Sequence, residues 1–295
     1  MYGRFQFLFV ARARGAARPR ISATAGHGQI APRPGGGQGP LAIMSELRVL
    51  FMHGLDSRGP LGRKAKHLQH HFPNTLVPQM QVSPIDPLRE QRSVTRWVLP
   101  YLLASMAVAA RQPTAARGLA AAAAAAVGLV PFLRWRVLAA VDSCAALQAA
   151  AIVEFQPDVV VGSSWGGRVA LRCMELGHWS GPAVLLAPAV GLKGALAAGM
   201  PGWDPAAPES LANLLGPQGA AAMCLVVMGE QDTLVSPEAV EAVCRRTGIK
   251  IEMVQNGDHR LNIALGMVKD KPAAGRLAEL VEAQVQVHGR GPRSS

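Results

Sequence analysis

Residues 161–168 read VGSSWGGR, and this stretch decides which fold the sequence predicts. Residues 162–166 have the pattern Gly-x-Ser-x-Gly, with Ser164 at its centre. The β-branched run 159–161 favours a buried parallel strand, and residues 165–176 are compatible with a helix. Flanking glycines permit the sharp strand-to-helix turn that exposes a serine hydroxyl. Ser164 is therefore the candidate nucleophile, and a helix-capping serine without activity is the alternative.

Two polar loops follow later in the chain, each after an apolar run. Asp232 follows the run 223–228, and His259 follows the run 249–254. Each lies where a parallel strand would end, so both are expected at the edge of the sheet that carries Ser164. A serine hydroxyl is activated by a neighbouring base, and a carboxylate orients that base. His259 is therefore the predicted base and Asp232 its partner. The neighbouring Asp258 is a poor substitute, because adjacent residues do not readily hold that geometry.

A fourth segment lies upstream, where the predicted strand 47–52 leads into His53-Gly54-Leu55. In hydrolases built around such a serine turn, the loop after this strand supplies a backbone N–H to the oxyanion hole. Leu55 and Trp165 are the candidate donors. The other residues expected near the substrate are His53, Gly54, Asp56 and Ser57. Of these, His53 is expected to bond the backbone, and the last two can equally stabilise a turn.

These motifs resemble those of the α/β-hydrolase superfamily. Residues 51–60 (FMHGLDSRGP) and 63–68 (RKAKHL) are similar to the small YqiA-type esterases and their plant relatives, and the resemblance covers about 47–100 and 135–285. It implies a mostly parallel sheet flanked by helices, in a minimal version that begins at the His-Gly strand.

The resemblance also implies a function. A Ser164–His259–Asp232 triad would cleave an acyl ester, as a carboxylesterase or thioesterase, through an acyl-enzyme and without a metal or other cofactor. The alternative is a non-catalytic protein of this fold that binds a small ligand or a protein partner. The sequence carries no signal for an oligomeric state.

The chain divides into an N-terminal extension and one domain with two interruptions. Residues 1–45 are expected to be a disordered extension, and residues 46–288 the hydrolase domain. An Ala-rich insertion at about 101–134 and a cap-like excursion at about 190–218 interrupt this domain. The apolar stretch 118–133 is short for a membrane span, so no stable span is expected.

Charge is distributed unevenly along the chain. Residues 1–45 hold six arginines and no acid, which accounts for +6 of the net charge of +11. No basic face with stacking aromatics is recognisable in residues 46–288, so nucleic-acid binding is not expected. The basic segment is typical of a transit peptide and would send the protein to a mitochondrion or chloroplast. If Met44 is the true start, or the extension has no targeting role, a cytoplasmic location is expected.

Cysteine and histidine spacing does not predict a metal site. The four cysteines form no Cys-x-x-Cys pair, and the three that fall in predicted helix or strand interiors are expected to be buried thiols. His67, His70 and His71 lack a nearby carboxylate or thiol to complete a ligand set, so a solvated helix face is expected for them.

Overall fold

A computed structural model describes residues 46–55, 59–80, 114–193, 219–267 and 275–291, with side chains omitted for 114–133. All of these residues belong to one unit, residues 38–295. The predictions for residues 1–45, for Asp56 and Ser57, and for most of the excursion at 190–218 lie outside the described residues. The sequence also predicts a helix over 84–99, with Pro84 near its start, and this segment too lies outside the described residues.

Within the described residues, six parallel strands form one sheet, in the order β2-β1-β3-β4-β5-β6. Their bounds are β1 Val49–Met52, β2 Thr75–Leu76, β3 Val159–Ser163, β4 Ala183–Leu186, β5 Cys224–Gly229 and β6 Lys250–Val254. The central strands β1, β3 and β4 are buried along their whole length, whereas β6 at the edge is mostly exposed or half-buried. Continuous apolar runs suit strands that are covered on both faces, so the predicted parallel sheet is confirmed.

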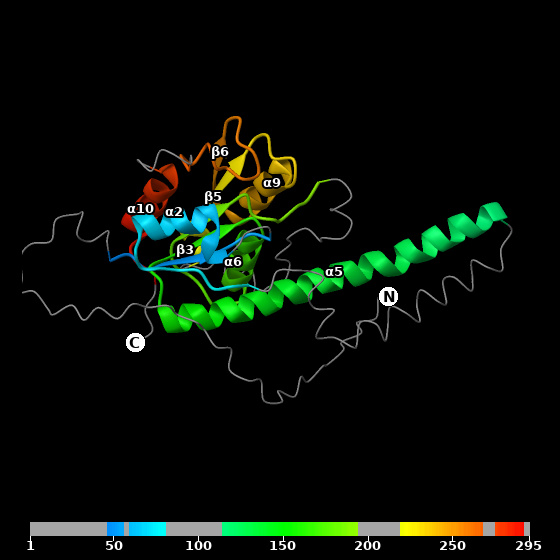
Figure 1. Ribbon diagram of the computed structural model, residues 1–295, viewed down its shortest axis with the longest axis horizontal. Helices are drawn as coiled ribbons and strands as arrows, with labels where there is room; N and C mark the ends of the chain where they lie inside the picture. The colour runs from blue at the N-terminus through cyan, green and yellow to red at the C-terminus, as the bar shows by residue number, and fades with distance from the viewer. Residues whose placement is uncertain (1–45, 56–58, 81–113, 194–218, 268–274, 292–295) are drawn as a thin grey trace, which may run out of the picture. The chain divides into compact units, whose positions relative to one another are not determined.

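Helices cover both faces of the sheet. The helical segments are η1 Gly59–Leu61, α2 Arg63–His71, α5 Thr114–Phe155, α6 Trp165–Glu175, η2 Ala220–Met223, α9 Pro237–Thr247 and α10 Arg276–His288. Helices α2 and α10 lie side by side, α6 packs on β1, β3 and β4, and α5 covers α6 (Figure 1). Right-handed crossovers place α2 on one face and α6 on the other, because the chain leaves β1 and β3 in opposite directions. Ligands of open parallel sheets bind in the crevice that such a reversal opens, and here it lies between β1 and β3.

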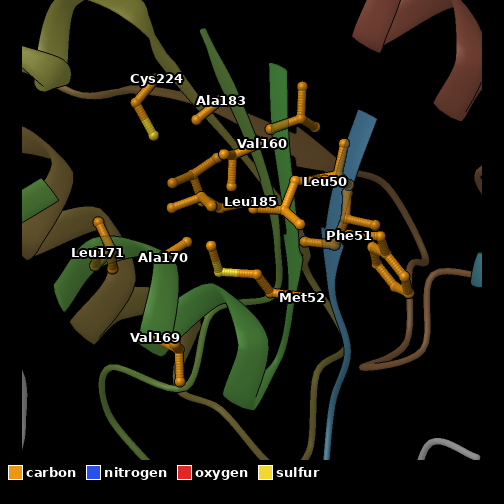
Figure 2. Packing of buried hydrophobic residues seen from close by; sticks show 14 of the residues in the cluster. Leu50, Phe51, Met52, Val160, Val169, Ala170, Leu171, Ala183, Leu185 and Cys224 are labelled. Carbon is orange, nitrogen blue, oxygen red and sulfur yellow. The ribbon is translucent and has the colours of Figure 1, made fainter. Parts of the chain in front are cut away.

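The core forms where α6 meets the centre of the sheet. Leu50 and Met52 of β1, Val160 of β3 and Leu185 of β4 are all almost completely buried. Figure 2 shows these side chains converging on one another, with Val169, Ala170 and Leu171 of α6 nearby. This packing anchors the strand whose end carries Ser164.

The sequence predicts a helix over 237–247, and α9 has the same bounds because local sequence signals set both of its ends. Ser236 precedes the helix, and its hydroxyl accepts a hydrogen bond from the Ala239 N–H at 3.2 Å. Pro237 occupies the first turn, where its missing N–H costs nothing. Gly248 ends the helix in the left-handed region at φ 71°.

Two elements differ from the expectation. The sequence predicts a second strand over 74–80, interrupted by Pro78, but the strand is limited to Thr75–Leu76, because Pro78 follows and cannot donate to a ladder. Helix α5 runs without a break from residue 114 to residue 155, across the predicted boundary between the insertion and the domain. Alanine is the strongest helix former, and the Ala120–Ala126 run therefore continues the helix that leads into β3.

The solvated histidine face predicted for α2 is wrong for two of its three residues. His67 and His71 are partly buried, with Nε2 atoms that reach no solvent and no hydrogen-bond partner, whereas His70 is exposed. Their rings lie close together, 4.6 Å between centroids for His67 and His71. The reason is the packing of α2 against α10, since a Cβ on Gly275 at the start of α10 would overlap the His67 ring.

One described segment, Arg134–Phe155 in α5, is long and apolar enough to cross a membrane by length and composition alone. A core helix passes the same test, and 33% of this segment's most apolar window is buried. It is weak evidence for a span, and the expected lack of a stable span stays a prediction.

Candidate active site

The turn between β3 and α6 places Ser164 in a conformation that few residues adopt. Ser164 has φ 54° and ψ −112°, outside the regions that side chains normally allow. The two glycines of the motif make this turn possible. A Cβ on Gly166 would lie 1.9 Å from the Met52 carbonyl oxygen, and one on Gly162 would lie 2.8 Å from the Gly167 Cα. The Gly-x-Ser-x-Gly spacing therefore reflects close backbone packing between β1, β3 and α6.

The Ser164 hydroxyl does not cap its own helix, although Ser164 stands at the N-cap position of α6. Its Oγ lies 3.0 Å from His259 Nε2. His259 Nδ1 lies 2.7 Å from Asp232 Oδ2. With the Nδ1–H donating to the carboxylate, Nε2 is free to accept the hydroxyl proton. The structure thus brings together the three predicted side chains in one hydrogen-bonded chain.

Close packing of two loops brings Asp232 and His259 together. Gly229 ends β5, and a Cβ there would lie 2.3 Å from the carbonyl oxygen of Gly257, in the loop after β6. The same carbonyl accepts the Gln231 N–H at 2.9 Å. Because these loops touch through their backbones, the side chains that follow them meet above the sheet edge.

Asp232 is held as an acceptor on both carboxylate oxygens. Its Oδ1 accepts the backbone N–H groups of Leu234 and Val235, each at 2.8 Å. Burial of the carboxyl raises its pKa, but the hydrogen bond from His259 and those from the two backbone N–H groups outweigh this effect, so the pKa is lowered overall. Asp232 is therefore charged and oriented at neutral pH.

The described start of the 190–218 excursion is joined to the Asp232 loop. Lys193 Nζ donates to the Asp232 carbonyl at 2.8 Å, and Leu192 forms an antiparallel bridge with Val235. The Ser236 N–H donates to the Gly191 carbonyl at 2.9 Å. The excursion therefore leaves the sheet directly beside the carboxylate.

His53 has a structural environment. It is fully buried, its Nδ1–H donates to the Gly54 carbonyl at 2.9 Å, and its Nε2 accepts the Met80 N–H at 3.1 Å. Burial lowers its pKa more than the Gly54 bond raises it, which favours the neutral ring that these two bonds require. His53 thus ties the loop after β1 to residue 80.

The predicted oxyanion donors lie at the ends of β1 and β3. Leu55 follows the His-Gly turn, and Trp165 is the first residue of α6. Within the described ranges, neither backbone N–H donates a hydrogen bond to a protein acceptor. Both groups are therefore available to a ligand.

A cavity of about 470 Å³ opens beside Ser164 and His259. Gly54 of the predicted set lines it, whereas His53 does not. Its other walls come from the segment 61–65 at the start of α2 and from Arg260 and Asn262 after His259. This volume suits a small organic molecule.

Sequence reasoning did not identify the contribution of α2 to this cavity. Lys64 Nζ donates to Ser163 Oγ at 2.9 Å, across 99 residues of chain, and Arg63 and Arg260 line the cavity. The RKAKHL motif contained this signal, because it places three cations, Arg63, Lys64 and Lys66, in the first turn of a helix that has no acid there. The sequence does not show which residue these cations lie beside. The pairing of β1 with β3 brings Lys64 to Ser163.

Among the described residues, no group of three or more His, Cys, Asp or Glu side chains could hold a metal ion. All four cysteines are buried, three of them as expected, and none of them forms a disulfide. Burial raises the pKa of Cys173 and of Cys244 to about 12, so these thiols stay protonated at neutral pH.

Several solved structures are similar to this chain at low sequence identity. One is a hydrolase of the alpha/beta superfamily from Xanthomonas campestris pv. campestris, with 16% identity, 81% of this chain and 99% of that chain covered, and a TM-score of 0.39. A Thermus thermophilus protein has 13% identity, 82% and 90% coverage, and a TM-score of 0.42. A serine hydrolase from Cycloclasticus zankles has 14% identity, 82% and 90% coverage, and a TM-score of 0.40. The comparison with curated proteins finds no match.

The family model for the alpha/beta hydrolase domain matches residues 136–287, which is more than half of the 295-residue chain. The match spans the serine turn and the loops that carry Asp232 and His259. It agrees with the parallel sheet, its helical layers and the resemblance seen in the motifs. The chain belongs to the α/β-hydrolase domain family.

Proposed function

We propose that this protein is a serine hydrolase that cleaves acyl esters through an acyl-enzyme on Ser164. The observation that carries the proposal is the hydrogen-bonded chain from Ser164 Oγ to His259 Nε2, at 3.0 Å, and from His259 Nδ1 to Asp232 Oδ2, at 2.7 Å. A serine that served only as a helix cap would direct its hydroxyl to the backbone of α6, and Ser164 does not.

The chemistry follows from the position of each group. His259 Nε2 takes the Ser164 proton as Oγ attacks the acyl carbonyl, and the imidazolium then protonates the departing alcohol or thiol. The buried, charged carboxylate of Asp232 holds the ring in the required tautomer and stabilises its cation. Water, activated by His259 in turn, releases the acid and restores the Ser164 hydroxyl.

The backbone N–H groups of Leu55 and Trp165 are proposed as the oxyanion hole. Trp165 is the first residue of α6, so its N–H lies at the positive end of the helix dipole. Each such donor lowers the barrier by roughly 3 kcal/mol in hydrolases where it has been removed. The proposed reaction uses only side chains and backbone groups of this chain.

Activity-based labelling tests the proposal. A fluorophosphonate probe should label the parent protein covalently, and Ser164→Ala should abolish the labelling. Ser163→Ala is the matched control, because it removes the neighbouring hydroxyl but leaves the proposed nucleophile in place. Equal labelling of the parent and Ser164→Ala would refute the assignment.

A panel of p-nitrophenyl esters separates an enzyme from a non-catalytic member of the fold. We expect turnover of short-chain esters that disappears in His259→Ala. Thermal stabilisation by these esters or their acids, without any turnover, would instead indicate a binding protein.

A further inference from the structure

The cavity beside Ser164 is lined by cations. Three of its lining residues are Arg63, Lys64 and Arg260, and none of the described lining residues is acidic. Arg63 and Lys64 come from α2, whereas Arg260 directly follows His259. The start of α2 and the loop after β6 therefore both bring positive charge to the same space.

Protein groups in the described part of the chain do not neutralise the two arginines. Neither Arg63 nor Arg260 makes an ion pair there. The acid nearest to Arg260 in sequence, Asp258, does not line the cavity, and its Oδ1 accepts the Leu261 N–H at 2.8 Å. Both guanidinium groups are thus available to an anion.

The placement of Arg63 and Lys64 is unfavourable for α2 by itself. They occupy the first turn of the helix, which contains no acid, and Gly62 caps it without a side-chain hydrogen bond. Cations at this end oppose the helix dipole, whereas a bound anion would interact favourably with the dipole and with both side chains. This charge arrangement destabilises the free protein, and it lies in a cavity that also contains the nucleophile. It therefore indicates that the ligand of the cavity is an anion.

We propose that the substrate of this site is an ester that carries a carboxylate on its acyl or its alcohol part, selected by Arg63, Lys64 and Arg260. The inference rests on the proposed hydrolase function and adds the substrate class. Arginine binds carboxylates through two parallel hydrogen bonds, so the two arginines supply specificity as well as charge. Lys64 bonds Ser163 beside the nucleophile and adds its charge close to the reacting group.

Paired esters test the inference on each side of the scissile bond. For the acyl side, the p-nitrophenyl monoester of adipate is compared with p-nitrophenyl hexanoate. For the alcohol side, p-acetoxybenzoate is compared with p-acetoxyacetophenone, which is neutral. Because acetyl withdraws electrons more strongly than carboxylate, each kcat/KM is divided by the rate of alkaline hydrolysis of the same ester. We expect kcat/KM for the anionic member to exceed that of its neutral partner by tenfold or more in one of the pairs, and added salt to reduce the ratio.

Arginine variants locate the selection. Arg63→Gln and Arg260→Gln should each lower the anionic-to-neutral ratio of kcat/KM by about tenfold, the size typical of one charge-assisted contact. Arg245→Gln on α9 is the matched control, since this exposed arginine does not line the cavity, and it should leave the ratio unchanged. Lys64 is left intact, because its bond to Ser163 would confound the result.

The possible failures can be told apart. Serine-dependent turnover without preference in either pair, or a preference that survives loss of both arginines, would overturn the inference and leave the hydrolase proposal standing. If no ester turns over and the fluorophosphonate probe does not label Ser164, the proposed function fails and the inference fails with it.

Discussion

Replacing Asp232 by asparagine tests how the carboxylate acts on His259. Oδ1 of Asp232 accepts two backbone N–H groups, and Oδ2 accepts the His259 Nδ1–H at 2.7 Å. An asparagine must keep its carbonyl oxygen toward the two backbone donors, so its NH₂ group would face His259. The ring would then accept at Nδ1 and carry its proton on Nε2, where it can no longer take the proton of Ser164.

The expected effect is therefore a change of tautomer without loss of the fold. The corresponding carboxylate-to-amide change in a serine protease lowers kcat by about 10⁴, or about 5 kcal/mol of barrier, and we expect a loss of this order. Stability should fall by only about 1–2 kcal/mol, since the backbone bonds are kept and one charge-assisted bond is weakened. The assay is turnover of a p-nitrophenyl ester, with urea denaturation to measure the free energy of unfolding.

Asp258→Asn is the matched control, since the same chemical change is made beside His259. Asp258 bonds the Leu261 N–H and does not contact the imidazole, so activity should stay within about threefold of the parent. Asp232→Asn turnover within tenfold of the parent, or a larger loss in Asp258→Asn, would refute the assignment of Asp232.

Two further predictions concern stability. Gly166→Ala should destabilise the fold by more than about 3 kcal/mol in urea, because the new Cβ would lie 1.9 Å from a backbone oxygen. Gly248→Ala, at φ 71° in open space, should cost about 1 kcal/mol, and equal losses in both variants would contradict this steric argument. Burial and the charges of the neighbouring histidines lower the pKa of His67 from 6.5 to about 4. Between these two pH values the unfolded chain binds a proton more readily than the folded protein does. The free energy of unfolding therefore decreases as pH falls from 6.5 to 4. At about 1.4 kcal/mol per pH unit, this loss of stability is at most about 3 kcal/mol, and solvent screening reduces it to about half. In urea titrations, His67→Gln should remove the pH-dependent loss, whereas His70→Gln on the exposed side of α2 should not.

Short-range signals predicted most of the described elements. The serine cap, proline and terminal glycine of α9 act within a few residues, and they place both of its ends correctly. The elbow was equally predictable, because a Gly-x-Ser-x-Gly turn between a β-branched run and a helix has few other conformations. The length of β2 and the continuity of α5 were not predictable from short-range signals. The hydrogen-bond ladder of β2 depends on its pairing with β1, and the ends of α5 depend on what the helix packs against.

The sequence by itself determined the succession of strands along the chain, the identity of the serine turn and the two polar loops that follow later strands. Only the tertiary structure decided that Lys64 bonds Ser163 and that the histidines of α2 pack against α10, and it brings His259 and the predicted Asp232 within hydrogen-bond distance. The physical reason is distance along the chain. A turn is governed by the backbone of a few residues, whereas contacts across 27 or 99 residues form only when parallel strands pair and their loops meet at one edge of the sheet.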